Sequence, residues 1–117
     1  MTRRTEVVAI AKTLPGVEEA TSYGEPSLEV RRALLTRLRL ADESIVLMDV
    51  VPDERDHLVA AEPGAFFVEP HYVPHPIVLV RLARIDAARL RPYLVRRWRG
   101  ITPKTLVRQH ESRHDAS

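Results

Sequence analysis

Four arginines gather around one predicted hairpin of this sequence. They are Arg31 and Arg32 at its turn, and Arg37 and Arg39 along its second strand. No acidic residue occurs between positions 30 and 41. A guanidinium group pairs with phosphate oxygens through parallel hydrogen bonds, so the cluster is suited to the backbone of a nucleic acid. The same pattern is also typical of an edge hairpin that charge protects from aggregation.

The C-terminal third of the chain holds a second basic group. Between residues 81 and 113 there are ten arginine or lysine residues and two acids, a net charge of +8, whereas the whole chain carries +2. The candidate phosphate contacts in this region are Arg96, Arg99 and Lys104. They lie on predicted amphipathic helices, whose basic face is either a polyanion-binding surface or an ordinary solvated one. Phosphate contacts without base recognition predict non-specific, salt-sensitive binding.

Aromatic and imidazole side chains form an alternative site for a protein or small ligand. Its candidate residues are Tyr23, His71, Tyr72 and His75. Three prolines stiffen the loop of residues 69–76, so the four-residue spacing of its two histidines is not a helical metal motif. The chain has no cysteine, and the sequence indicates no third ligand, so we expect no metal and no cofactor. No nucleophile motif is present either, which predicts a protein that is not an enzyme.

Size and composition are those of one small globular domain. At 117 residues, with 44% hydrophobic and 29% charged residues, the chain is long enough for a single core without disulfides. We expect one domain over residues 1–117, with a frayed tail over 112–117. The N-terminus has no signal-peptide pattern, and no apolar run approaches the roughly 20 residues that cross a bilayer. These features predict a cytoplasmic protein that does not contact membranes.

The order of hydrophobic patterns predicts an α+β fold, a twisted antiparallel sheet with helices packed on one face. We expect a first helix capped by Thr2 or Thr5, a loop over residues 17–26, and strands over 28–30, 34–40 and 45–51. A helix capped by Asp53, strands over 66–68 and 77–83, and a helix capped by Asp86 follow. Pro92 is expected to kink that helix, and a last helix begins at Pro103.

Several motifs, in order along the chain, resemble the MmcQ/YjbR family of small bacterial proteins. They are Leu14-Pro15-Gly16-Val17, Tyr23-Gly24-Glu25-Pro26, Pro70-His71-Tyr72, the strand from Pro76 to Leu82, and Trp98 followed by Pro103 to Val107. The resemblance implies a CyaY-like (frataxin-like) fold and DNA binding through hairpins that act as wings. Many members have a Gly-Lys-Val-Phe turn in the first hairpin, where this chain has Arg31-Arg32-Ala33-Leu34.

Overall fold

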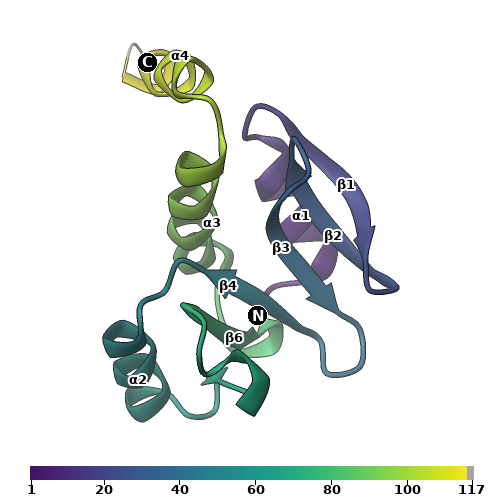
Figure 1. Ribbon diagram of the computed structural model, residues 1–117, viewed down its shortest axis with the longest axis vertical. Helices are drawn as coiled ribbons and strands as arrows, with labels where there is room; N and C mark the ends of the chain where they lie inside the picture. Colours follow the sequence, from purple (N-terminus) through teal and green to yellow (C-terminus); the bar gives the residue numbers. More distant parts are fainter. Residues whose placement is uncertain (116–117) are drawn as a thin grey trace.

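The chain folds into one twisted antiparallel sheet with helices packed against it (Figure 1). The computed structural model describes residues 1–115. The elements are α1 (Arg4–Lys12), β1 (Val17–Ser22), β2 (Glu25–Val30), β3 (Ala33–Arg39), β4 (Ser44–Met48), α2 (Pro52–Ala61), β5 (Phe66–Phe67), η1 (Pro70–Tyr72), β6 (Ile77–Arg81), η2 (Leu82–Arg84), α3 (Ala87–Ile101) and α4 (Lys104–Asp115). The strand order is β1-β2-β3-β4-β6-β5. The predicted α+β class is confirmed.

The main hydrophobic core lies between the helices and one face of the sheet. Each of α1 to α4 contributes to it, through Val7, Leu58, Leu94 and Val107 among others. On α3 the predicted apolar stripe is fully buried, and Trp98 at its end has no exposed surface. The Trp98 indole also donates a hydrogen bond of 2.8 Å to the Pro15 carbonyl. The predicted packing of the helices on one face of the sheet is therefore confirmed.

The opposite face of the sheet carries a smaller apolar cluster. Tyr72, placed by the short η1 turn, packs there with Val46, Ile77 and Leu79. Because β4 and β6 have a core on each side, nearly all of their residues are buried. This agrees with the continuous apolar runs in their sequences.

The predicted loop over residues 17–26 is wrong, because Val17–Ser22 forms the edge strand β1. It pairs with β2 along its whole length, from Val17 opposite Val30 to Ser22 opposite Glu25. None of its residues is fully buried, and Glu18 and Glu19 face solvent. A polar, half-exposed edge strand has no strong apolar alternation, which is why the pattern missed it.

Two predicted helix caps are also wrong. Arg3 is the N-cap of α1, and its N–H donates to the Glu6 carboxylate at 3.0 Å. Thr2 is instead buried, and its hydroxyl donates to the Ile85 carbonyl at 2.6 Å. The second helix begins at Pro52, so Asp53 lies inside its first turn rather than at the cap. There its negative charge still complements the helix dipole.

One further detail differs from the sequence pattern, and two expectations stay untested. A β-bulge between β2 and β3 breaks the alternation expected over residues 34–40, so Leu35 and Leu38 both enter the main core. Helix α3 runs from Ala87 to Ile101 and contains Pro92, and the kink expected there stays a prediction. Helix α4 spans Lys104–Asp115, residues 116 and 117 lie outside the described residues, and the fraying expected over 112–117 stays a prediction.

Candidate nucleic-acid interface

Arg31 and Arg32 form the two-residue turn between β2 and β3. Val30 and Ala33 pair on either side of it. Both arginines have positive φ, 49° and 71°, which is the signature of a type I′ turn. Both side chains are exposed, and neither forms an ion pair with a residue of the described chain. The hairpin therefore presents two unneutralised positive charges at its tip.

Helix α3 supports this hairpin close to its turn. The Arg97 Nε donates a hydrogen bond of 2.9 Å to the backbone carbonyl of Leu34, near the start of β3. The same guanidinium lies 3.2 Å from an Asp49 carboxylate oxygen. These contacts place the β2–β3 turn at the same end of the molecule as the α3–α4 connection (Figure 1). The arginine turn and the basic residues around the α3–α4 connection thus share one end of the fold.

The predicted phosphate contacts on α3 and α4 differ in whether an acidic side chain of the same protein neutralises them. Arg96 makes two hydrogen bonds with the Glu54 carboxylate, of 2.7 and 3.0 Å, so its charge is neutralised. Arg99 pairs with Glu111 at 3.1 Å through Nε, but 58% of its side chain is exposed. Lys104 is exposed and forms no ion pair with the described side chains of residues 1–112. Lys104 therefore has its full charge available to an outside partner, Arg99 has it in part because Glu111 contacts only its Nε, and Arg96 does not.

The ion pair of Arg96 and Glu54 also shifts both pKa values. The hydrogen bond from Arg96 lowers the pKa of Glu54, against the opposing effect of partial burial. The hydrogen bond to Glu54 raises the pKa of Arg96. This pair connects α3 to the first turn of α2, which is a structural role.

Two shallow hollows follow the exposed side of α3 onto α4. The first, of about 480 Å³, is lined by Arg91, Pro92, Val95, Arg96 and Arg99. The second, of about 390 Å³, is lined by Arg99, Lys104, Val107, Arg108 and Glu111. Arg99 borders both. Sequence analysis did not single out Arg91 and Arg108, although both belong to the basic C-terminal third.

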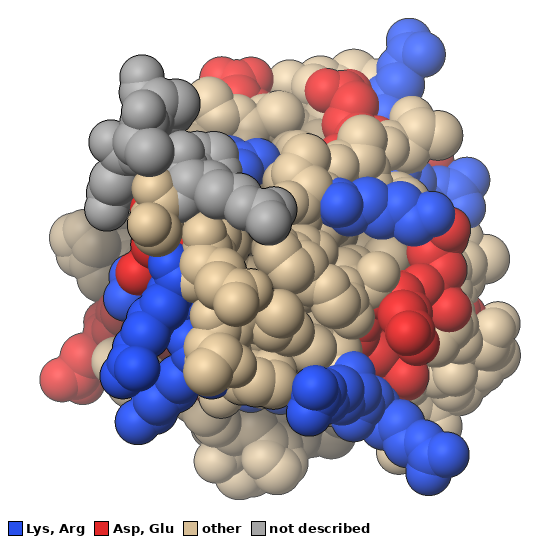
Figure 2. All heavy atoms as spheres, turned by 90° about the horizontal axis from the view of Figure 1, so that it is seen from above, with Lys and Arg blue, Asp and Glu red and all other residues tan. Residues whose placement is uncertain are grey.

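The charges at this end do not form one continuous patch. Figure 2 views the molecule from above Figure 1 and shows lysine and arginine side chains in several separate groups. Acidic side chains lie between some of them, and uncharged surface crosses the middle of the view. A polyanion at this end would therefore be held at separated points, and no contiguous basic surface is visible in this view.

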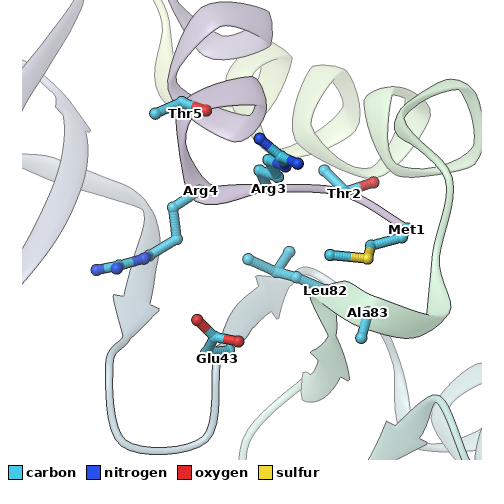
Figure 3. Close-up of a pocket in the computed structure, with 8 residues that line it drawn as sticks. All are labelled: Met1, Thr2, Arg3, Arg4, Thr5, Glu43, Leu82 and Ala83. Carbon is cyan, nitrogen blue, oxygen red and sulfur yellow. The ribbon is translucent and has the colours of Figure 1, made fainter.

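A hollow beside the first residues of the chain lacks the predominantly basic lining of the two hollows on α3 and α4. It measures about 380 Å³, and Figure 3 shows Arg4 and Glu43 on one side of it, Met1 and Ala83 on the other. Its lining mixes both signs of charge with hydroxyl and apolar groups, and such a mixture selects no particular ligand. We assign it no function.

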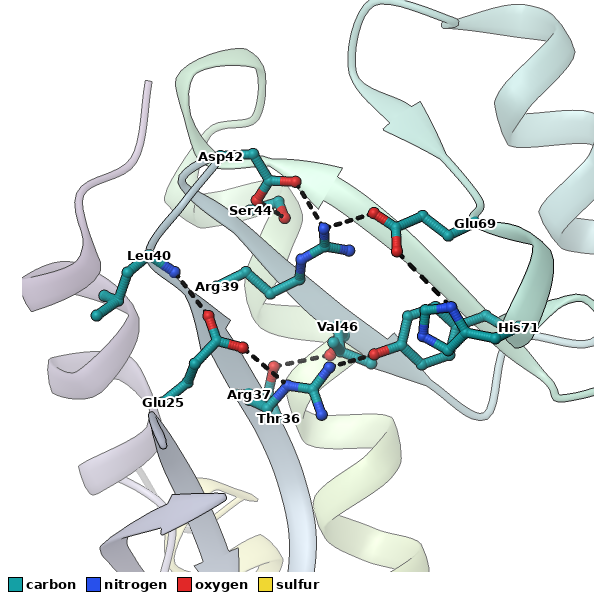
Figure 4. A network of polar contacts seen from close by, with 11 residues as sticks. Glu25, Thr36, Arg37, Arg39, Leu40, Asp42, Ser44, Val46, Glu69 and His71 are labelled. Carbon is teal, nitrogen blue, oxygen red and sulfur yellow. Dashed lines mark hydrogen bonds and ion pairs between the residues drawn. The ribbon is translucent and has the colours of Figure 1, made fainter. Parts of the chain in front are cut away.

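Arg37 and Arg39 lie on β3 but turn into a polar network on the smaller-core face of the sheet (Figure 4). Arg39 pairs with Asp42 at 2.9 Å and with Glu69 at 2.5 Å. Arg37 lies 3.5 Å from a Glu25 oxygen and donates to the Tyr72 hydroxyl. Only about 15% of each arginine side chain is exposed. Burial lowers the pKa of Arg39, but the hydrogen bond to Glu69 and the charge of Asp42 outweigh it and raise that pKa overall.

Three of the four alternative ligand-site residues come together beside Arg37. Tyr23, His71 and Tyr72 line a common pocket with Glu25 and Arg37. The fourth, His75, does not line it. Its backbone N–H donates to the Tyr72 carbonyl, and its own carbonyl accepts a hydrogen bond of 2.9 Å from Arg55.

Arg55 was missed by sequence analysis, and it holds this loop in place. It is buried on α2 and donates to the carbonyls of Val73 and His75, at 3.1 and 2.9 Å. A single base in an acidic segment was the only signal in the sequence. Such a residue is recognised as structural only when its partners, 18 and 20 residues away, are known.

Among the side chains that the structure describes, those of residues 1–112, no group of three or more His, Cys, Asp or Glu is arranged to hold a metal ion. None of the described helices is long and apolar enough to cross a membrane.

Comparison with known proteins identifies bacterial relatives without an assigned role. Over 50 residues the chain is 44% identical to the uncharacterized protein Rv2570 of Mycobacterium tuberculosis. It has the same identity over the same length to the uncharacterized protein Mb2600 of Mycobacterium bovis. The match covers 43% of this chain and 39% of each relative, well under two thirds of their length. No family model matches the chain, and no solved structure does so.

Proposed function

We propose that this protein binds double-stranded DNA through its phosphates, with Arg31 and Arg32 as the principal contacts. Arg99 and Lys104, at the same end of the molecule, form a second group of contacts. The proposal needs no catalytic role, and it places the protein with DNA in the cytoplasm. It also includes membership of the MmcQ/YjbR family, with a CyaY-like fold, as the ordered motifs suggest.

The observation that carries the proposal is the conformation of the Arg31-Arg32 turn. A type I′ turn favours Asn-Gly, because both central residues need positive φ. A residue with a side chain costs roughly 1 kcal/mol or more in this conformation. Arginine is thus a poor choice for the turn itself, and these two side chains make no ion pair within the described chain that offsets the strain. What they supply is positive charge on a projecting tip.

The chemistry of the two side chains fits phosphate. Arginine presents a planar fork of N–H donors that matches two phosphate oxygens and remains charged at any physiological pH. A two-stranded hairpin is narrow enough to lie along a groove while its tip contacts the backbone. Because such contacts do not distinguish bases, we expect weak sequence preference and strong salt dependence.

The proposed interface is smaller than the set of basic residues in the sequence suggests. Arg37, Arg39 and Arg96 are left out of it, because acidic partners within the fold neutralise them. A phosphate could reach them only by displacing a carboxylate that is already hydrogen-bonded or ion-paired.

Charge reversal tests the proposal. We expect Arg31→Glu combined with Arg32→Glu to weaken binding to a fluorescent random duplex by about tenfold or more at low salt. The matched control is Arg4→Glu combined with Arg84→Glu, since both of these arginines are exposed and form no ion pair among the described residues. The control changes net charge equally and should weaken binding far less. Equal losses in the two variants would mean that only overall charge matters, and would overturn the assignment to the hairpin tip.

A further inference from the structure

A pocket lies at the other end of β2, away from the Arg31-Arg32 turn. It measures about 410 Å³, and its lining residues are Tyr23, Glu25, Arg37, His71 and Tyr72. They come from the β1–β2 turn, two strands and the η1 turn. Small-molecule sites typically have volumes of about 300–1,000 Å³, so the pocket has room for a planar ring with a substituent.

One wall of the pocket is an aromatic ring that nothing covers. Tyr23 is 92% exposed, although large aromatic side chains are normally buried. Its ring centroid lies 5.6 Å from the Arg37 guanidinium carbon. Tyr23 also has φ of 52°, a left-handed conformation that is strained for an aromatic residue. As at the arginine turn, the pairing of the flanking strands imposes a strained backbone conformation, and this conformation fixes the position of an exposed side chain.

A second flat surface borders the same pocket. The His71 ring packs on the Tyr72 ring with centroids 4.0 Å apart. The His71 side chain is 66% exposed, and its Nδ1 lies 3.8 Å from a Glu69 oxygen. The pocket is therefore bordered by two exposed rings, those of Tyr23 and His71.

The polar groups of the pocket offer both donors and acceptors. Arg37 donates to the Tyr72 hydroxyl through Nη2, and its buried Nε has no hydrogen-bond partner among the described residues. The Glu25 carboxylate lies 3.5 Å from that Nε and also accepts the Leu40 N–H at 3.0 Å (Figure 4). Because Glu25 offsets the charge of Arg37, a simple anion gains little here. A neutral ring with adjacent donors and acceptors on its edge matches both groups.

We propose that this pocket binds an unpaired nucleobase, either of a free nucleotide or of a single strand. Nucleobases are planar rings that stack on exposed aromatic side chains, and their edges combine N–H donors with carbonyl or ring-nitrogen acceptors. The base stacks against Tyr23 and His71. Its edge meets the Glu25 carboxylate and the Arg37 guanidinium.

This inference does not depend on DNA binding at Arg31 and Arg32. The two turns lie at opposite ends of β2, about 20 Å apart at the usual rise per residue. Variants at one turn therefore leave the other intact, and either function can fail alone.

The test is a titration of the ¹⁵N-labelled protein with the four common ribonucleoside monophosphates, followed by amide chemical shifts. We expect saturable shifts at Tyr23, Gly24, Glu25, His71 and Tyr72. Ribose 5-phosphate, which lacks the ring, serves as the ligand control. Equal binding of ribose 5-phosphate, or no shift with any nucleotide at about 10 mM, would overturn the proposal.

A variant separates stacking from general effects on the fold. Tyr23→Asn removes the ring and tolerates the left-handed conformation, so the protein should remain folded. We expect it to weaken nucleotide binding about fivefold or more, as the loss of one stacking side chain does. Thr21→Asn, at an exposed position on β1 that does not line the pocket, should leave binding unchanged. Unchanged binding in Tyr23→Asn would contradict the stacking role.

A short oligonucleotide distinguishes the two sources of the base. Tighter binding of a single-stranded hexamer than of its mononucleotides, lost in Tyr23→Asn, supports an unpaired strand as the ligand. Binding of the hexamer no tighter than that of its mononucleotides supports a free nucleotide. Hexamer binding that Tyr23→Asn leaves intact while Arg31→Glu with Arg32→Glu abolishes it would place strand binding at the other turn and overturn the proposal for this pocket.

Discussion

Arg97 and Leu34 join the longest helix to the hairpin, through a hydrogen bond of 2.9 Å from the Arg97 Nε to the Leu34 backbone carbonyl. Leu34 is two residues beyond the Arg31-Arg32 turn, so the helix fixes the position of the hairpin near its tip. The same guanidinium pairs with Asp49, in the segment after β4. One partly buried charge network thus sets where the exposed charges of the tip lie.

We predict that Arg97→Met destabilises the protein by about 1–2 kcal/mol, because it removes hydrogen bonds from a charged group to a carbonyl and a carboxylate. Urea unfolding measures this change. Amide hydrogen exchange at residues 31–34 should also become faster. Arg91→Met on the same helix removes only a 3.3 Å contact to the Thr13 hydroxyl, and should change stability by less than about 0.5 kcal/mol. Similar losses in both variants would argue against a special role for Arg97.

We predict that Arg31→Asn combined with Arg32→Gly raises the free energy of unfolding by about 1 kcal/mol. Asn-Gly is favoured in a type I′ turn, whereas arginine is strained at the observed φ values. Chemical denaturation of the two proteins under the same conditions measures the difference. A loss of stability would show that the arginines contribute contacts to the fold, contrary to their exposure.

We predict that Arg55→Met loosens the loop of residues 69–76. Arg55 is only 6% exposed in its side chain, and it holds the carbonyls of Val73 and His75. Loss of these charged hydrogen bonds should cost about 1.5–3 kcal/mol and increase amide exchange in the loop. His57→Ala, at an exposed position on the same helix, is the control. Unchanged loop exchange in Arg55→Met would show that the loop is held by the packing of Tyr72 alone.

We predict that Glu54 stabilises the protein above pH 4.5 and not in strong acid. Its pKa in the folded protein lies below the ordinary 4.5, because Arg96 donates a hydrogen bond to its carboxylate. A lowered pKa gives stability that is fully present above the unfolded value and is lost as pH falls through the folded value. The difference in Tm between the native protein and Glu54→Gln should therefore be constant from about pH 6 to 5 and shrink below 4.5. A difference that stays constant down to about pH 3 would contradict this account.

Local patterns predict the interior of this fold well. The spacing of Leu90, Leu94 and Trp98 places one face of α3 in the core, and the apolar run that begins at Ile45 predicts the central strand β4, with apolar residues on both faces. Helix α3 is recognisable because its burial is periodic, and the central strand because its apolar run is continuous. Strand β1 has no such period, since it lies at the sheet edge with half its side chains in solvent.

The candidate site is less predictable, because it depends on partners far away in the chain. Arg39 meets Glu69 across 30 residues, and Arg96 meets Glu54 across 42. A charge count along the sequence treats such arginines as available, whereas the fold neutralises them. The backbone strain at Arg31 and Tyr23 could not be predicted either, because the positive φ values are imposed by the pairing of the flanking strands and not by the turn residues themselves.

The most direct measurement is the salt dependence of duplex binding by the native protein and by Arg31→Asn with Arg32→Gly. This variant removes two charges without reversing them, in a fold that should be at least as stable. Because each phosphate contact contributes about 0.9 to the slope of log affinity against log salt, we predict that the slope becomes shallower by nearly 2. An unchanged slope, or a native protein that does not bind at low salt, would contradict DNA binding through the hairpin tip.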